Sequence, residues 1–465
     1  MRKRRTQAVV VIHGIGEQKP MGTVRSFVAS VLPSAPAGPQ YFSKPDPLSG
    51  TLELRTLQNR QQPRTHFFEY YWASQVDGTT LAHVAGWTKS LLLRKPSKIP
   101  PNLKTIWFLS WGLLVAGLAF WFQWFLRKAP DTGVASNIWI GFCLTTVWAI
   151  VQGFLVKSLG DAARYLSPIP ENIKMRRTIR DEGLQLLRSL HDAKGPKGEP
   201  LYERIVVVGH SLGSVIAYDL LRQLWAEMHS TYSRPQPCEQ SALAEAERLA
   251  NALSEQLKRN PSTKDCRITQ VQEYQNAQWE LFQEMSKLGN AWRITDLITV
   301  GSPLTHAPLL LAKDSDDLIQ RQVERELPTC PPIIDEEHGS LDRFSYQIWK
   351  PFGAPSDSFH LRAPHHGAPF GPTRWTNLYM PTWAGVAGDL VGGPLAPCFG
   401  PGVLDVAVRG PNWIRTHTLK AHSSYWSPGS SESGSNDEPR LSLDALRDAL
   451  ALDLDPAELS DTPPV

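Results

Sequence analysis

Residues 204–221 read Arg-Ile-Val-Val-Val-Gly-His-Ser-Leu-Gly-Ser-Val-Ile-Ala-Tyr-Asp-Leu-Leu, and this stretch decides the fold. The β-branched run at 205–208 is long enough for one buried parallel strand, and the apolar spacing of 215–225 predicts a helix. Between them, residues 209–213 match the G-x-S-x-G pattern of a nucleophile elbow. The glycines let strand and helix pack closely, which lifts the hydroxyl of Ser211 off the sheet. The stretch therefore predicts a nucleophilic serine, with an inert turn as the alternative.

Composition limits the classes of protein to consider. The 465 residues carry a formal net charge of +3 and contain no basic stripe interleaved with aromatic residues, so nucleic acid is not expected as a partner. Five scattered cysteines without metal-ligand spacing are typical of a reducing compartment. The basic N-terminus precedes an apolar run, 8–12, that is too short for an export signal and is predicted to be a strand.

The strand at 8–12 leads into a second glycine-rich turn, which reads His-Gly-Ile-Gly at residues 13–16. Flexible glycines allow backbone N–H groups to converge on one point, as the oxyanion of a tetrahedral intermediate requires. We therefore predict that Gly14 and Ile15 contribute to an oxyanion hole. A tight strand-to-helix turn without a catalytic role is the alternative.

The His-Gly turn, the elbow and a Gly-Ser-Pro strand end at 301–303 together resemble the α/β-hydrolase superfamily, in particular its membrane-associated lipases and esterases. The resemblance implies a mostly parallel, doubly wound α/β sheet. It also implies that the backbone N–H of Leu212, directly after the nucleophile, is a further oxyanion donor. The strands that usually precede the His-Gly turn are missing from this chain, so we expect a shortened sheet.

A serine hydroxyl needs a histidine base, which a carboxylate orients. In the resembling fold the three follow in the order serine, acid, histidine, each after the end of a strand. Asp389 is the one carboxylate between residues 380 and 402, after the strand predicted at 374–379, and Asp405 is the second choice. Asp296 and Glu337 come too early in the chain to serve as this acid.

The base should follow the last strand, where His417 and His422 are available. We prefer His422 because it lies beyond the stretch 416–419 and because the resemblance favours a histidine followed by serine and tyrosine. The predicted triad is therefore Ser211, Asp389 and His422.

Two uncharged stretches interrupt the hydrolase-like pattern. Residues 105–126 and 138–156 are rich in Trp, Phe, Leu and Ala, and both are long enough to cross a bilayer. The short loop between them predicts a transmembrane helical hairpin within residues 94–165. Basic residues flank the hairpin more densely than they occupy its loop, which places the catalytic domain on the cytoplasmic side. A hairpin buried in a soluble core, a lid and a re-entrant hairpin are the alternatives.

An insertion at about 235–290 follows the elbow helix. Helical periodicity at 241–258 and 270–288 predicts a helical pair, either a cap over the site or a solvated excursion. The polar loops at 326–372 contain histidines and carboxylates, but no pair lies at i and i+4 on a helix. We therefore expect no metal and no other cofactor.

The predicted organisation is an α/β-hydrolase domain interrupted by the hairpin and followed by a Ser-, Gly- and acid-rich tail. Its parts are the first part of the hydrolase domain (1–93), the transmembrane hairpin (94–165), the rest of the hydrolase domain (166–426) and the flexible acidic tail (427–465).

The function predicted from these features is that of a membrane-anchored serine hydrolase that cleaves carboxylic esters through an acyl-enzyme. Because the anchor would hold the enzyme against the bilayer, a lipid ester or acyl thioester is the expected substrate. A non-catalytic, membrane-anchored interaction module and an acyltransferase with the same triad are the alternatives. The sequence does not indicate an oligomeric state.

Overall fold

A computed structural model describes most of the chain, and all structural statements below concern the residues that it describes. These are 6–14, 19–32, 39–49, 53–59, 62–75, 101–126, 170–233, 239–259, 264–336, 342–351, 358–382, 387–418, 420–428 and 439–452, with the single residues 96, 99, 146 and 165.

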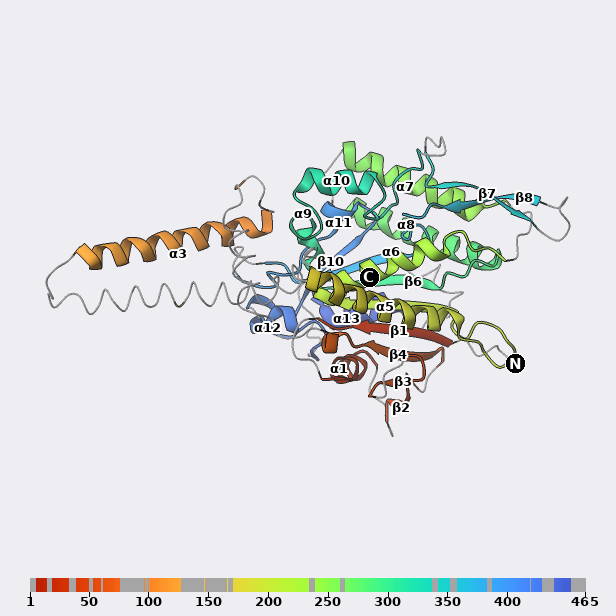
Figure 1. Ribbon diagram of the computed structural model, residues 1–465, viewed down its shortest axis with the longest axis horizontal. Helices are drawn as coiled ribbons and strands as arrows, with labels where there is room; N and C mark the ends of the chain where they lie inside the picture. Colours follow the sequence, from red (N-terminus) through yellow and green to blue (C-terminus); the bar gives the residue numbers. More distant parts are fainter. Residues whose placement is uncertain are drawn as a thin grey trace.

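A nine-stranded, mostly parallel sheet lies at the centre of the described residues, in the order β11-β10-β9-β6-β5-β1-β4-β3-β2 (Figure 1). All neighbouring strands from β11 to β4 are parallel, and β3 and β2 complete the sheet as antiparallel edge strands. The strands are β1 (Thr6–Ile12), β2 (Tyr41–Pro45), β3 (Arg55–Asn59), β4 (Arg64–Tyr70), β5 (Arg204–His210), β6 (Ile294–Val300), β9 (Arg374–Tyr379), β10 (Leu404–Arg409) and β11 (Arg440–Leu441). The expected α/β class with a mostly parallel sheet is therefore correct.

The sheet is not shortened. The edge beyond β4 is occupied by β3 and β2, which follow the His-Gly turn in the chain instead of preceding it. A separate antiparallel hairpin is formed by β7 (Ser345–Pro351) and β8 (Ser358–Pro364).

Helices cover both faces of the sheet because its central strands are apolar on both sides. One face carries α5 (Pro170–Asp192), α6 (Leu212–Met228), α7 (Ser241–Arg259) and α8 (Lys264–Lys287), whose apolar side chains share a core with alternate residues of β1 and β5. The other face carries α1 (Gly22–Val31) and α13 (Ser442–Leu450), which pack on the intervening residues of the same strands. The short helices are α9 (Ala307–Leu310), α10 (Ser315–Val323), α11 (Ala396–Phe399) and α12 (Trp413–His417), with 3-10 turns η1 (Ala73–Gln75), η3 (Pro303–His306) and η4 (Ala421–Ser423).

The helical insertion is neither a cap nor a solvated excursion. Tyr274 of α8 donates a hydrogen bond to the carbonyl of Phe370, and Gln278 donates to the carbonyls of Phe370 and Thr373. Phe370 and Thr373 precede β9, so α8 is attached to the end of the sheet at which the parallel strands begin. The pair of helices is therefore part of the layer that covers one sheet face.

The predicted transmembrane hairpin is wrong, and with it the predicted two-span membrane localisation. The cytoplasmic placement of the catalytic domain was inferred from the hairpin alone and loses its basis. Among the residues described, no helix is both long and apolar enough to cross a bilayer. Residues 105–126 do belong to a helix, α3 (Pro101–Leu126). A long stretch without charged residues is necessary for a membrane span but does not by itself establish one. The second predicted span, 138–156, lies outside the described residues apart from Thr146.

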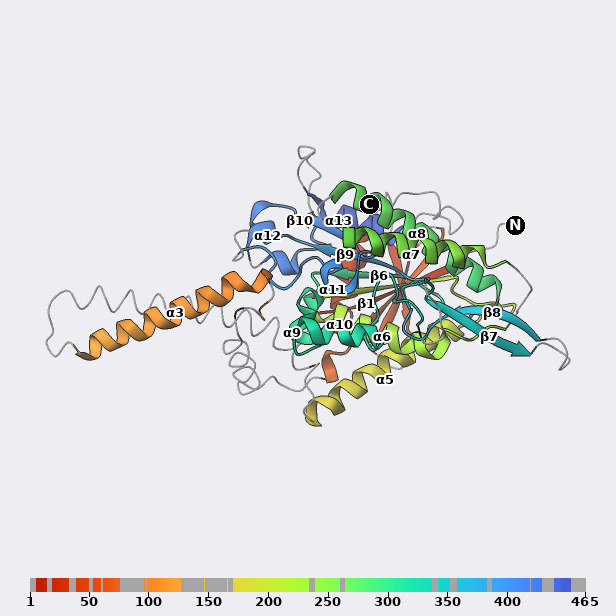
Figure 2. The same cartoon turned by 90° about the horizontal axis from the view of Figure 1, so that it is seen from above.

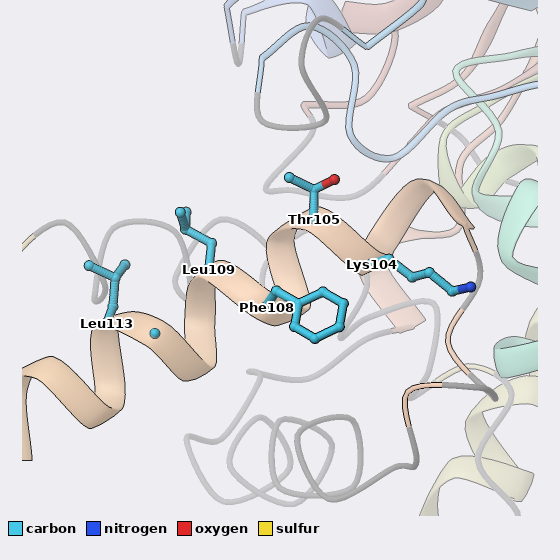
Figure 3. A pocket seen from close by; sticks show the side chains of 6 residues that line it. Lys104, Thr105, Phe108, Leu109 and Leu113 are labelled. Carbon is cyan, nitrogen blue, oxygen red and sulfur yellow. The ribbon is translucent and has the colours of Figure 1, made fainter.

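Helix α3 extends away from the sheet in two perpendicular views (Figures 1 and 2). Its exposed apolar side chains include Phe108 and Leu109, which lie beside Lys104 and Thr105 along an open cavity of about 720 Å³ (Figure 3). No residue of the predicted triad lines this cavity.

Residues 440–450 of the expected flexible tail are structured. They form β11 and α13, and Leu446 and Leu450 are fully buried on the sheet. The chain after residue 452 lies outside the described residues.

Candidate active site

The G-x-S-x-G sequence forms a tight turn between β5 and α6. Ser211 has φ 53° and ψ −127°, a backbone conformation that a non-glycine residue seldom adopts and that stores strain. A Cβ on Gly209 would lie 2.5 Å from the Ser214 Cα, and one on Gly213 would lie 2.2 Å from the Ile12 carbonyl oxygen. Both positions therefore need glycine, as the sequence predicted.

The structure brings the three predicted triad residues together. The Oγ atom of Ser211 lies 2.8 Å from Nε2 of His422, and Nδ1 of His422 lies 3.0 Å from Oδ1 of Asp389. Because an ionised carboxylate only accepts hydrogen bonds, Nδ1 carries the imidazole proton and Nε2 is left to accept from the serine hydroxyl. The three residues come from the β5–α6 turn, the loop after β9 and the turn η4.

Asp389 is fully buried and accepts hydrogen bonds from four donors. Besides His422, the Tyr425 hydroxyl donates at 2.6 Å, and the backbone N–H groups of Val391 and Gly392 donate at 2.9 and 3.0 Å. Burial by itself would raise the pKa of Asp389. The imidazole of His422 and these hydrogen bonds outweigh burial and hold the pKa below its usual range, so the carboxylate stays charged.

The residues considered as alternatives have other partners. Asp405 accepts from the backbone N–H groups of Leu395 and Ala396 and caps the start of α11. Asp296 lies between Arg204 and Arg374 in a buried ion cluster. His417 stacks on Trp413 in α12. Glu337 lies outside the described residues.

Two of the three predicted oxyanion residues lie beside the nucleophile. A Cβ on Gly14 would come within 2.8 Å of the Ser211 Cβ, so the backbone of this turn touches the serine. Leu212 is the first residue of α6, and a backbone N–H at this position has no acceptor within the helix. Ile15 lies outside the described residues.

His13 fixes the conformation of the Gly14 turn through a hydrogen bond to Gly14 and contacts with Trp72. Its Nδ1 is 2.7 Å from the Gly14 carbonyl oxygen, its ring stacks on Trp72, and the Trp72 indole N–H donates to the His13 carbonyl. Burial lowers the pKa of His13 to about 4, so the ring is neutral and acts as an uncharged donor.

The Gly-Ser-Pro strand end at residues 301–303, to which the resemblance gave no specific role, has a clear geometric one. Gly301 has φ +55°, and a Cβ there would lie 3.0 Å from Oδ2 of Asp389 and 3.2 Å from Nδ1 of His422. The Ser302 hydroxyl is 2.6 Å from that of Ser214, which in turn donates to the Ser211 carbonyl. The strand end therefore leaves room for the acid and base and braces the elbow.

Sequence reasoning did not assign a role to Tyr425. Its hydroxyl accepts from the Met380 backbone N–H at 2.9 Å and donates to Asp389, so it links the acid loop to the base turn. The one available signal was the tyrosine three positions after His422, which the resemblance used only to choose between histidines.

The described residues hold no cluster of three or more His, Cys, Asp or Glu side chains able to bind a metal. A cavity of about 910 Å³ between α7, residues 329–336 and α11 lies apart from the triad, since none of the three triad residues lines it. Comparisons with protein-family models, with curated proteins and with solved structures found no match for this chain.

Proposed function

We propose that this protein is a serine hydrolase of the α/β-hydrolase type that cleaves carboxylic esters or thioesters. The observation that carries the proposal is the unbroken hydrogen-bonded chain Ser211–His422–Asp389 next to the strained elbow. A serine held by an inert turn has no physical need for a neutral imidazole backed by a buried carboxylate. The mostly parallel sheet with the serine at the end of a central strand also supports this assignment.

In the proposed reaction, Nε2 of His422 takes the proton of Ser211 while Oγ attacks the carbonyl carbon of the substrate. The negatively charged carbonyl oxygen is stabilised by the N–H of Leu212 and by the Gly14 turn. His422 then protonates the leaving alcohol or thiol. Water attacks the acyl-enzyme by the reverse sequence and releases the acid.

Asp389 contributes by keeping the proton on Nδ1 of His422 and by stabilising the imidazolium that forms in each step. Its charge is preserved by the hydrogen bonds described above. The expectation of a lipid substrate depended on a membrane anchor. Without that anchor, the proposal extends only to esters and thioesters as a class.

The test is covalent labelling with a fluorophosphonate probe, combined with hydrolysis of a short-chain p-nitrophenyl ester. Wild-type protein should be labelled and active, and Ser211→Ala should be neither while keeping its thermal unfolding transition. Ser254→Ala is the matched control, because that hydroxyl donates to the Ala250 carbonyl within α7, a helix that contributes no triad residue. Folded wild-type protein that neither labels nor hydrolyses would reject the proposal in favour of a non-catalytic module. Acyl transfer to an added alcohol in place of hydrolysis would identify an acyltransferase.

A further inference from the structure

His210, the residue before the nucleophile, is partly exposed, and its side chain contacts the base turn. Its Nε2 lies 2.9 Å from the backbone carbonyl oxygen of His422. A carbonyl can only accept, so His210 is the donor and carries its proton on Nε2. Among the described residues, this is the one side-chain hydrogen bond that holds the main chain of His422.

Aromatic rings fix the orientation of this imidazole. The Trp426 ring meets it edge-on with centroids 4.9 Å apart, and the His422 ring lies 5.2 Å away at a tilt of 30°. Removal from water, together with the neighbouring His422, lowers the pKa of His210 to about 3. The ring is therefore neutral near pH 7, and the bond to the His422 carbonyl keeps its proton on Nε2.

The other side of the His210 ring faces the oxyanion turn. A Cβ on Gly14 would lie 3.0 Å from Nδ1 of His210, so the turn packs directly on this ring. One side chain thus contacts the elbow, the Gly14 turn and the base turn η4, which are far apart in the sequence. Errors in the relative placement of these three segments are costly, since displacement of a catalytic group by about 1 Å can reduce the rate by about 100-fold.

We propose that His210 is a positioning residue: its Nε2–H bond to the His422 carbonyl holds the base turn at the distance at which His422 can accept the Ser211 proton. This role rests on the proposed hydrolase function. His210 does not touch the reacting atoms, and it acts through the main chain of His422.

The test compares two substitutions that differ in hydrogen bonding. His210→Gln can place its amide N–H near the position of Nε2, whereas His210→Met has similar length but no donor. The Gln variant should keep the labelling rate of Ser211 and the kcat for p-nitrophenyl butyrate within about threefold of wild type. The Met variant should lose about 10- to 100-fold in both, with KM changed by less than about twofold. His229→Met, at the far end of α6, is the matched control and should leave the kinetics unchanged.

Amide hydrogen exchange across residues 421–426 provides a readout that does not need catalysis. Exchange should accelerate in the Met variant and remain as in wild type in the Gln variant. Wild-type kinetics and exchange in the Met variant, or equal losses in the Gln and Met variants, would overturn the positioning role. If His210→Met does not fold, His210→Asn replaces it, because its shorter amide is polar but does not reach the carbonyl.

The two proposals fail in different ways. A wild-type protein that is folded but is not labelled refutes the hydrolase function. The exchange experiment still decides whether His210 holds the base turn.

Discussion

Tyr425→Phe removes the hydroxyl that donates a hydrogen bond to Asp389, the acid of the proposed triad. The lost bond is a 2.6 Å O–H···O contact to a fully buried carboxylate, and the Met380 N–H loses its acceptor as well. A hydrogen bond to a charged group contributes about 1.5–3 kcal/mol, so we expect a stability loss of that size in urea denaturation at pH 7. Phenylalanine fills the same volume as tyrosine apart from the hydroxyl, so no large cavity adds to the loss.

The same substitution should also change the kinetics. With one donor fewer, the Asp389 carboxylate is more basic and attracts the His422 imidazolium more strongly. The acid limb of the kcat/KM profile should therefore move to higher pH. We expect kcat/KM at its optimum to fall by about tenfold, which corresponds to about 1.4 kcal/mol.

Tyr274→Phe is the matched control for this experiment. The Tyr274 hydroxyl is also fully buried, but it donates to a neutral backbone carbonyl, that of Phe370, at 3.0 Å. It should cost about 1 kcal/mol of stability and leave the pH profile unchanged. If Tyr425→Phe shows the wild-type pH profile and loses no more stability than Tyr274→Phe, the argument that Tyr425 supports the charge on Asp389 is refuted.

Asp389→Asn should lower kcat by about 10³- to 10⁴-fold because the imidazole loses its charged partner, whereas Asp405→Asn should keep kcat within about tenfold; steady-state kinetics on both variants would expose a wrong choice of acid. Gly213→Ala should destabilise the fold by about 3 kcal/mol or more, because the added Cβ would lie 2.2 Å from a backbone oxygen. Gly22→Ala has no atom nearer than 4.0 Å and should be neutral or stabilising by up to about 1 kcal/mol in the same urea titration. Burial raises the pKa of Glu69 to about 6, so its protonated form is favoured by folding. Wild-type stability should therefore fall by about 2 kcal/mol relative to Glu69→Gln as the pH rises from 4.5 to 7, and a constant difference would contradict this.

Local sequence was sufficient to predict the elbow because each of its residues is constrained by its immediate neighbours in the chain. The β-branched run of β5, the two glycines and the apolar stripe of α6 each predict one part of the turn. The His-Gly turn after β1 is constrained in the same way. Chain order then selected Asp389 and His422, and the hydrogen bonds join them to Ser211 as expected.

Features that depend on packing between distant segments could not be predicted in this way. The role of Tyr425 requires the acid loop and the base turn to meet, and the attachment of α8 requires Gln278 to face the start of β9. The two helical patterns of the insertion fit a cap, a solvated excursion or a covering layer equally well. The run in α3 was predicted to span a membrane from its length, apolar composition and lack of charge, and these local properties do not by themselves establish a span.

Chain order favoured Asp389 over Asp405, and the strand register gives the geometric reason. In the strand register, Asp405 lies opposite Asn377 and Asn377 lies opposite Thr299. Thr299 in turn lies opposite Gly209, two residues before the serine. Asp405 is therefore nearly level with the serine along the strands. It lies three strands away, however, at roughly 14 Å. A single imidazole that hydrogen-bonds to both groups cannot bridge this distance between Asp405 and Ser211.

Asp389 reaches the base because its loop turns back over the end of β6, the strand next to β5. The contact that allows this joins two glycines: a Cβ on Gly392 would lie 2.8 Å from the Gly301 Cα and 2.7 Å from Oδ2 of Asp389. The positive φ of Gly301 turns the chain away after β6 at the same point. Both glycines are visible in the sequence, but their contact is not. The acid is therefore defined by the close approach of two backbones, and its carboxylate reaches His422 only because neither of these residues has a side chain.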